Sequence, residues 1–155
     1  MKDDIDYHVE QVENVLKSVV NAAEAMALEI ARPYWERTKE LRDDKSHNTS
    51  AWFKYSLSIR RETGTPRSPS DRLVISWKKL RWVKTKKGTL LQSDSVRKKV
   101  DGTYAMSSFS DAGPEELRMI EAINSQMQKV WDTLKFVGNT RKTRSNIFRK
   151  YNSRD

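Results

Sequence analysis

Residues 4–32 carry an apolar stripe of a kind that only a long helix can display. Its positions are spaced alternately by four and three residues: Ile5, Val9, Val12, Leu16, Val19, Ala23, Met26 and Ile30. This heptad spacing keeps one seam of a helix against a partner helix, supplied by the same chain or by a second copy. Pro33 is expected to break or kink the helix, and its ring also suits a new first turn that runs to about residue 44.

A second long helix is expected near the C-terminus. The segment 113–116 places a proline at the first helical position and two glutamates against the positive end of the helix dipole. A broad apolar face follows: Leu117, Ile120, Ile123, Met127, Val130, Trp131, Leu134 and Val137. The pair Gly138 and Asn139 is expected to weaken or end this helix.

Between the helices the apolar period changes from that of a helix to that of strands. Residues 53–60 alternate apolar and polar side chains, which is typical of a strand with one buried face. Residues 73–84 form a second such run, whose parity changes after Trp77 and so suggests a bulge near Lys78 and Lys79. The segment 86–88 is a turn, residues 89–96 form a third strand, and residues 103–106 are a candidate fourth.

These patterns predict one α+β domain over residues 1–155, with helical regions at 4–44 and 114–152 and a basic β-rich region at 51–110. We expect the two long helices to pack together, with a three- to four-stranded antiparallel sheet between them in sequence. The apolar face of the sheet is expected to pack on a helix.

Positive charge is concentrated in the middle of the chain. The net charge is −4 for residues 1–50, +10 for residues 51–110 and +3 for residues 111–155, within a total of +9. Like charges held together mark a surface that a polyanion can offset. The alternative is a solubilising excess of lysine.

Several other classes of function lack their sequence signals. The chain has no cysteine and two histidines, and no glycine-rich phosphate loop. We therefore expect no catalytic residues, no metal site and no cofactor, and hence a non-enzymatic protein. No apolar run reaches the roughly 18–20 residues that span a bilayer, and the acidic N-terminus does not resemble a signal peptide. We expect a protein without membrane contact that stays in the cytoplasm.

The basic β-rich region is the candidate nucleic-acid site, because a two-stranded ribbon can enter a major groove. Arg81 is the candidate for reading guanine, and Lys86 and Lys87 at the turn are candidates for phosphates. Trp77 and Trp82 either stack on unpaired bases or belong to the core. The full set of candidate nucleic-acid-binding residues is Lys54, Arg60, Arg61, Arg67, Arg72, Lys78, Lys79, Arg81, Lys84, Lys86, Lys87, Arg97, Lys98, Arg141, Lys142 and Arg144.

The order of short aromatic and basic motifs resembles a known family. An acidic helix ending in Tyr34-Trp35-Glu36 is followed by the segment 75–82, by Lys86-Lys87-Gly88, by the segment 104–109 and by the C-terminal helix. This order resembles the MobI family of auxiliary conjugative-transfer proteins of integrative and conjugative elements and large plasmids. The resemblance implies a cytoplasmic bacterial protein that acts at the transfer origin with the relaxase and does not itself cut DNA.

Residues and resemblance together suggest an auxiliary DNA-binding protein whose partners are double-stranded DNA at the transfer origin and the relaxase. The acidic first helix is free for protein contacts, including a homodimer. Two alternatives remain open: a transcription regulator of a mobile element, and a scaffold whose basic block docks an acidic protein without binding DNA.

Overall fold

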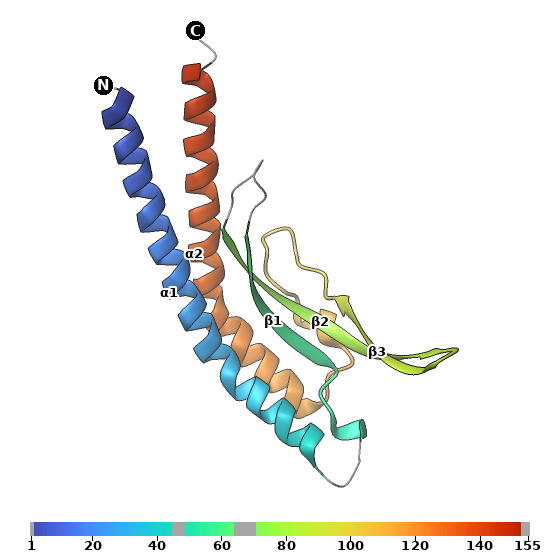
Figure 1. The fold of residues 1–155 in the computed structure, drawn as a ribbon. Coiled ribbons are helices and arrows are strands. Elements are labelled where there is room, and N and C mark those ends of the chain that lie inside the picture. The colour runs from blue at the N-terminus through green and yellow to red at the C-terminus, as the bar shows by residue number, and fades with distance from the viewer. Residues whose placement is uncertain (1, 45–48, 64–70, 153–155) are drawn as a thin grey trace.

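The chain folds into two long helices and one antiparallel sheet (Figure 1), as seen in a computed structural model that describes residues 2–44, 49–63 and 71–152. The three strands lie in the order β1-β2-β3. In chain order the elements are α1 (Lys2–Asp43), η1 (Thr49–Ala51), β1 (Tyr55–Glu62), β2 (Arg72–Thr85), β3 (Gly88–Ser95), η2 (Met106–Phe109) and α2 (Pro114–Asn152). The predicted α+β class is confirmed. The candidate fourth strand is wrong, because residues 103–105 have no regular structure and a 3₁₀ turn begins at Met106.

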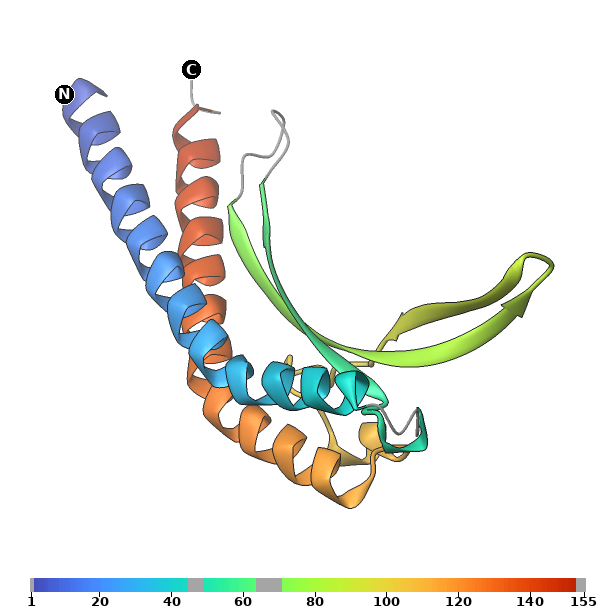
Figure 2. The same ribbon diagram turned by 60° about the horizontal axis from the view of Figure 1, so that its bottom comes forward.

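The two helices lie side by side and antiparallel, so both termini are at the same end of the molecule, where the helices draw apart (Figures 1 and 2). Each is one continuous helix. The predicted restart at Pro33 is wrong, because α1 passes through the proline. The predicted weak point at Gly138 does not end α2, which continues for another fourteen residues to Asn152. Packing of the apolar faces on both sides of these residues outweighs their low helix propensity. None of the helices in the described ranges is long and apolar enough to cross a membrane.

The buried stripe of α1 follows the helix period rather than the heptad period. The buried positions are Leu16, Val20, Ala23, Ala27, Ala31 and Tyr34. The interval from Leu16 to Tyr34 is eighteen residues over five turns, which is the 3.6 residues per turn of a straight helix. A strict heptad drifts by about 20° per repeat against such a helix. The heptad prediction is therefore wrong for most of its positions: only Leu16 and Ala23 are buried, whereas Ile5, Val12 and Met26 are exposed. Val20 and Ala27 occupy the core places that were expected for Val19 and Met26.

Aromatic side chains fill the space between the helices and the sheet. The Trp77 side chain is fully buried, and its ring meets Tyr34 edge-on at 5.1 Å and Phe109 at 5.6 Å between centroids. Its indole N–H donates to Asn124 Oδ1 at 2.8 Å on α2. Edge-to-face packing of this kind stabilises the core beyond what the burial of apolar area contributes. Trp77 is thus a core residue of β2, as the second of the two interpretations held.

A buried carboxylate joins α2 to the start of β1. Glu116 is 2% exposed, and its Oε1 accepts the main-chain N–H of Tyr55 at 2.7 Å while its Oε2 accepts that of Lys54 at 3.0 Å. The hydroxyl of Tyr34 on α1 lies 3.0 Å from Oε1 and 2.8 Å from the carbonyl oxygen of Tyr55. One side chain therefore holds both helices and the first strand together.

The Tyr34 hydroxyl has one proton but two acceptors within hydrogen-bond distance. If Glu116 is protonated, it can donate to the Tyr34 oxygen while Tyr34 donates to the Tyr55 carbonyl, so both bonds are satisfied. Burial raises the pKa of Glu116, although the bonds from Lys54 and Tyr55 act in the opposite direction. Burial also raises the pKa of Tyr34 far above its ordinary value, so this hydroxyl stays a donor.

We expect Glu116→Leu to lower the free energy of unfolding by about 2–5 kcal/mol, because two buried N–H groups lose their acceptor. Glu116→Gln should cost about 1–3 kcal/mol, since its amide nitrogen must face one of these N–H groups. Urea unfolding followed by circular dichroism measures both. The control is Glu115→Gln on the same turn, where the ion pair with Arg37 is exposed and the change should be small. Equal effects at the two positions would contradict this role of Glu116.

Candidate nucleic-acid interface

The second half of β2 and the whole of β3 form a hairpin that projects away from the helices (Figure 2). Residues 72–79 of β2 pair with β1, and residues 78–85 pair with β3. Every residue of β3 is exposed. Beyond residue 79 the hairpin is therefore a two-stranded ribbon, and its β3 strand is in solvent on both faces. Trp77 is the last buried residue of β2, and the residues that follow it are partly or fully exposed.

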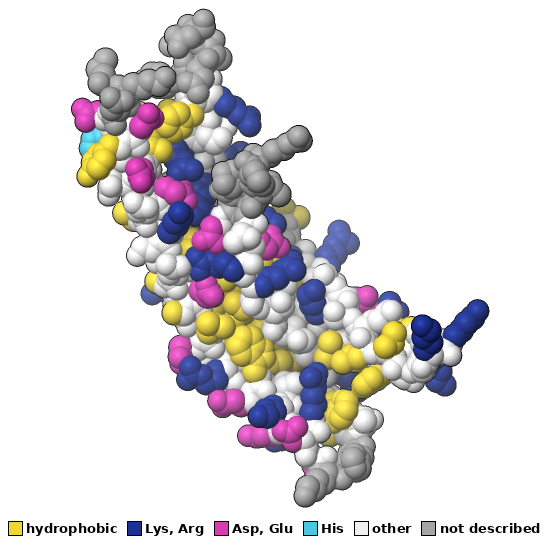
Figure 3. Space-filling view, in the orientation of Figure 1, with side chains coloured by type: hydrophobic (Ala, Val, Ile, Leu, Met, Phe, Trp, Pro, Cys, Tyr) yellow, Lys and Arg dark blue, Asp and Glu magenta, His cyan; other side chains and the backbone are white. Residues whose placement is uncertain are grey.

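The hairpin concentrates positive charge. Residues 78–93 contain six lysine or arginine residues and no acid. Lys and Arg side chains gather at its tip in Figure 3. The turn itself consists of Lys86 and Lys87, and Gly88 follows with a φ of 129°, a conformation that side-chain-bearing residues rarely adopt. The tip can hold several cations because its residues are exposed and none of them packs on the core.

The two faces of the hairpin carry different side chains. The outer face is the sheet face opposite to buried Leu73, Ile75 and Trp77; on it lie Lys78, Leu80, Trp82 and Lys84 of β2, as alternation along a strand requires. Lys79 and Arg81 lie on the inner face. The pairing of β2 is continuous through residues 78 and 79, so the predicted bulge is wrong. The apolar alternation changes after Trp77 because the buried half of β2 ends there.

Ion pairs separate these cations into two groups. Arg81 Nε lies 2.6 Å from Asp94 Oδ2 on β3, and Lys79 pairs with Asp111. By contrast Lys78, Lys84, Lys86 and Lys87 have no carboxylate within ion-pair distance in the described part of the chain. Both Arg81 and Asp94 are more than half exposed, so water screens their pair and it opens at little cost. The charge that is free to meet a polyanion thus sits on the outer face and at the turn.

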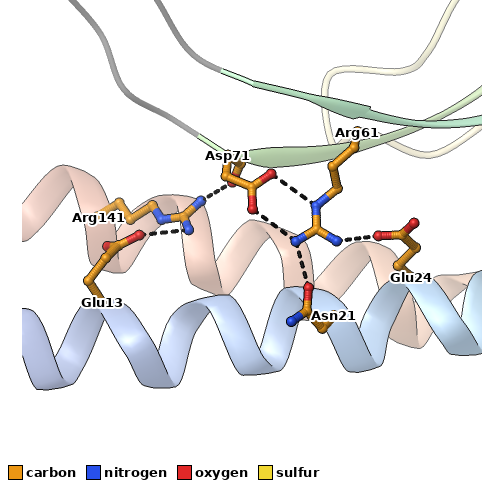
Figure 4. Close-up of polar contacts among 6 residues, drawn as sticks. All are labelled: Glu13, Asn21, Glu24, Arg61, Asp71 and Arg141. Atoms are coloured by element: carbon orange, nitrogen blue, oxygen red, sulfur yellow. Dashed lines mark hydrogen bonds and ion pairs between the residues drawn. The ribbon is translucent and has the colours of Figure 1, made fainter. Parts of the chain in front are cut away.

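Arg61 and Arg141, at the other end of the sheet, are used to fasten it to the helices (Figure 4). Arg61 donates through Nε and Nη2 to the two oxygens of Asp71, both at 2.9 Å, and also contacts Glu24 and Asn21 of α1. Arg141 of α2 donates to the main-chain oxygen of Asp71 at 2.5 Å and to Glu13 at 3.0 Å. This clamp is bidentate and partly buried, so its arginines are engaged within the fold.

The remaining candidates are scattered. Arg60 and Arg72 share Glu62, Arg144 pairs with Glu13, and Lys142 and Arg97 are exposed. The Lys98 ammonium donates to the carbonyl oxygen of Ile75 at 3.1 Å, and burial lowers its pKa. Lys54 immediately precedes β1, and its main-chain N–H donates to Glu116. Arg67 lies outside the described residues. The structure therefore brings together the hairpin residues and leaves the C-terminal ones on α2.

Sequence reasoning missed Trp52. Its ring lies 6.2 Å from that of Trp82 between centroids, and Trp82 is 55% exposed. Trp52 precedes buried Phe53, so continuing the alternation of β1 by one residue would have placed it on the outer face.

The described ranges hold no group of three side chains that could bind a metal ion; His8 packs against the ring of Tyr7, and His47 lies outside those ranges.

A family model described as MobI protein matches residues 23–145, which is more than half of the chain. The match confirms the resemblance suggested by the short motifs, and it includes the whole sheet and the clamp residue Arg141. No curated protein and no solved structure gives a significant match.

We expect Asp71→Asn to destabilise the fold at neutral pH by about 1–3 kcal/mol, because it weakens the charged bonds to Arg61. The Arg61 guanidinium lowers the pKa of Asp71. A lowered folded-state pKa contributes stability above the ordinary Asp pKa of about 3.9, and this is lost as pH falls through the lowered value. Urea midpoints of wild type and variant should therefore converge below about pH 4. The control Asp94→Asn should have a small effect at every pH. If the difference in urea midpoint between wild type and Asp71→Asn stays constant with pH, the ionised Asp71 carboxylate does not stabilise the fold through Arg61.

Proposed function

This chain belongs to the MobI family, which is related to mobilisation, and we propose that it is a DNA-binding auxiliary protein of conjugative transfer. In this proposal it recognises the transfer origin and assists assembly of the relaxase without cutting DNA. The observation that carries the proposal is the projecting hairpin, in which four lysines have no carboxylate within ion-pair distance among the described residues. A polyanion is the ligand that such a surface fits best.

The dimensions of the hairpin support a duplex as the ligand. Eight residues of β2 pair with β3, which corresponds to an arm of about 25 Å at the rise of a strand. A two-stranded ribbon of this kind fits the major groove, which is about 12 Å wide. Lys86 and Lys87 at the tip then meet phosphates, while Arg81 on the inner face is placed to reach base edges once Asp94 releases it.

The first part of α1 supports a separate surface for protein partners. Ile5, Tyr7, Val12 and Val15 are exposed there, on a helix whose acidic side chains would be repelled by DNA. We assign to this surface the contact with the relaxase or with a second copy of the chain.

Selection of bound fragments from the DNA of a mobile element that encodes the protein tests the proposal as a whole. Fragments that contain the transfer origin should be enriched at physiological salt. Enrichment of a promoter instead would favour a transcription regulator. Failure to retain any fragment would favour a scaffold that docks an acidic protein.

We predict that the logarithm of the binding constant for duplex DNA falls with the logarithm of salt concentration at a slope of about −4, because four lysines neutralise phosphates. Lys86→Ala combined with Lys87→Ala should reduce the slope to about −2 and weaken binding to all sequences alike. Fluorescence anisotropy at several salt concentrations measures this. The matched control replaces exposed Lys129 and Lys135 of α2 by alanine. An equal loss of slope in the control would place the interface on α2 and contradict the hairpin site.

Arg81→Ala should weaken binding to a selected fragment by about 1–3 kcal/mol and binding to a shuffled duplex much less, because only the former loses a base contact. Asp94→Asn should strengthen binding to both duplexes, since it frees Arg81 and removes a negative charge. Competition binding with the two duplexes measures the difference. If Arg81→Ala lowers the affinity for both duplexes equally, Arg81 contacts the backbone and does not read sequence.

A further inference from the structure

Two tryptophans lie together as an aromatic pair on the outer face where the hairpin leaves the body: Trp82, which is exposed, and Trp52, which is partly buried. Trp52 and Trp82 are tilted by 42° to each other, so the two rings do not cover one another face to face. Leu91 of β3 lies directly opposite Trp82 and is 43% exposed. Hydrophobic side chains are visible at the root of the hairpin in Figure 3. An exposed tryptophan beside an exposed leucine forms an apolar patch, and such patches mark binding sites on protein surfaces.

Nothing in the described ranges covers this part of the sheet. Both helices pack on the opposite face, against the side of β2 that carries Leu73, Ile75 and Trp77. β3, which borders the aromatic pair, is exposed along its full length. The Trp82 ring is therefore accessible and the Trp52 ring is partly so, and neither belongs to the buried core.

The side chains around the aromatic pair favour an anionic ligand. On β2, Lys78 precedes Trp82 by four residues and Lys84 follows it by two, on the same face; neither has a carboxylate within ion-pair distance in the described ranges. Glu62 is the one acid on the outer face of the described strands, and it lies at the far end, held by Arg60 and Arg72. The other polar groups of this face are mainly serine hydroxyls, at Ser56, Ser58, Ser76, Ser93 and Ser95.

We propose that the outer face around Trp52 and Trp82 binds unpaired bases of single-stranded DNA. Bases stack on exposed aromatic rings without regard to sequence, and cations on both sides of the rings meet the phosphates that flank each base. Lys78 and Lys84 are about 20 Å apart along the strand, enough for a short run of nucleotides. This inference rests on the proposed function and deepens it: the same hairpin would bind duplex DNA through Arg81 and the turn, and an unpaired strand through the outer face around Trp82.

The test compares three fluorescent probes: a thymidine strand of about twelve nucleotides, an abasic strand with the same number of phosphates, and a duplex of the same length. Wild-type protein should bind the thymidine strand at least about fivefold more tightly than the abasic strand. Trp82→Thr, which suits a strand, should abolish that preference, and Trp82→Phe should keep most of it. Duplex affinity should change by less than about twofold in both variants. Phe136→Ala, which removes an exposed ring from α2, should change nothing.

Three results would overturn the inference. Equal binding of wild type to the thymidine and abasic strands would show that the rings do not stack on bases. A preference that survives Trp82→Thr would place stacking elsewhere. An equal loss of duplex and single-strand binding in Trp82→Thr would make Trp82 a support of the hairpin. In the first two cases retained duplex binding leaves the proposed function standing, whereas failure to bind any probe overturns both.

Discussion

The architecture depends on one buried carboxylate. Glu116 accepts two main-chain N–H groups at the entry to β1 and meets the Tyr34 hydroxyl of α1, so it fixes where the first strand starts relative to both helices. β2 takes its register from β1, and the hairpin is a continuation of β2. The direction in which the basic arm points is thus set at a residue that makes no contact with the arm. Desolvation makes such a group costly, and the three hydrogen-bond partners offset that cost.

A second constraint is the difference in length between neighbouring strands. β2 has fourteen residues and β1 has eight, so β2 runs past the edge of the core. An isolated two-stranded ribbon is marginally stable in water. Here its first rungs belong to a three-stranded sheet that the Arg61 clamp and the aromatic core hold on the helices. The hairpin can project because its first rungs are held in the three-stranded sheet. Its outer half is available for binding because β3 is exposed.

The sequence predicted the elements well and their exact packing less well. Alternation over residues 53–60 and 73–84 and the turn at 86–88 placed the sheet, because strand period and turn chemistry are local. The heptad interpretation of α1 placed only Leu16 and Ala23 correctly in the core, since the partner surface selects between two stripes that differ by one residue. Arg61 and Arg81 were both candidate DNA-binding residues in the sequence. Only the fold shows that Arg61 meets Asp71 and Glu24 across three elements, whereas Arg81 has an exposed partner on the adjacent strand.

The uninterrupted pairing of β2 with β3 has a consequence for how this protein can evolve. Because side chains alternate, deleting Leu80 would exchange the faces of the residues that follow it in β2: Trp82 and Lys84 would turn inward, and Arg81 would turn outward. No bulge is present to absorb such a change. A change of length within this part of β2 therefore keeps the two faces in place only when it adds or removes two residues. Such changes lengthen or shorten the ribbon and keep each face's chemistry where it was.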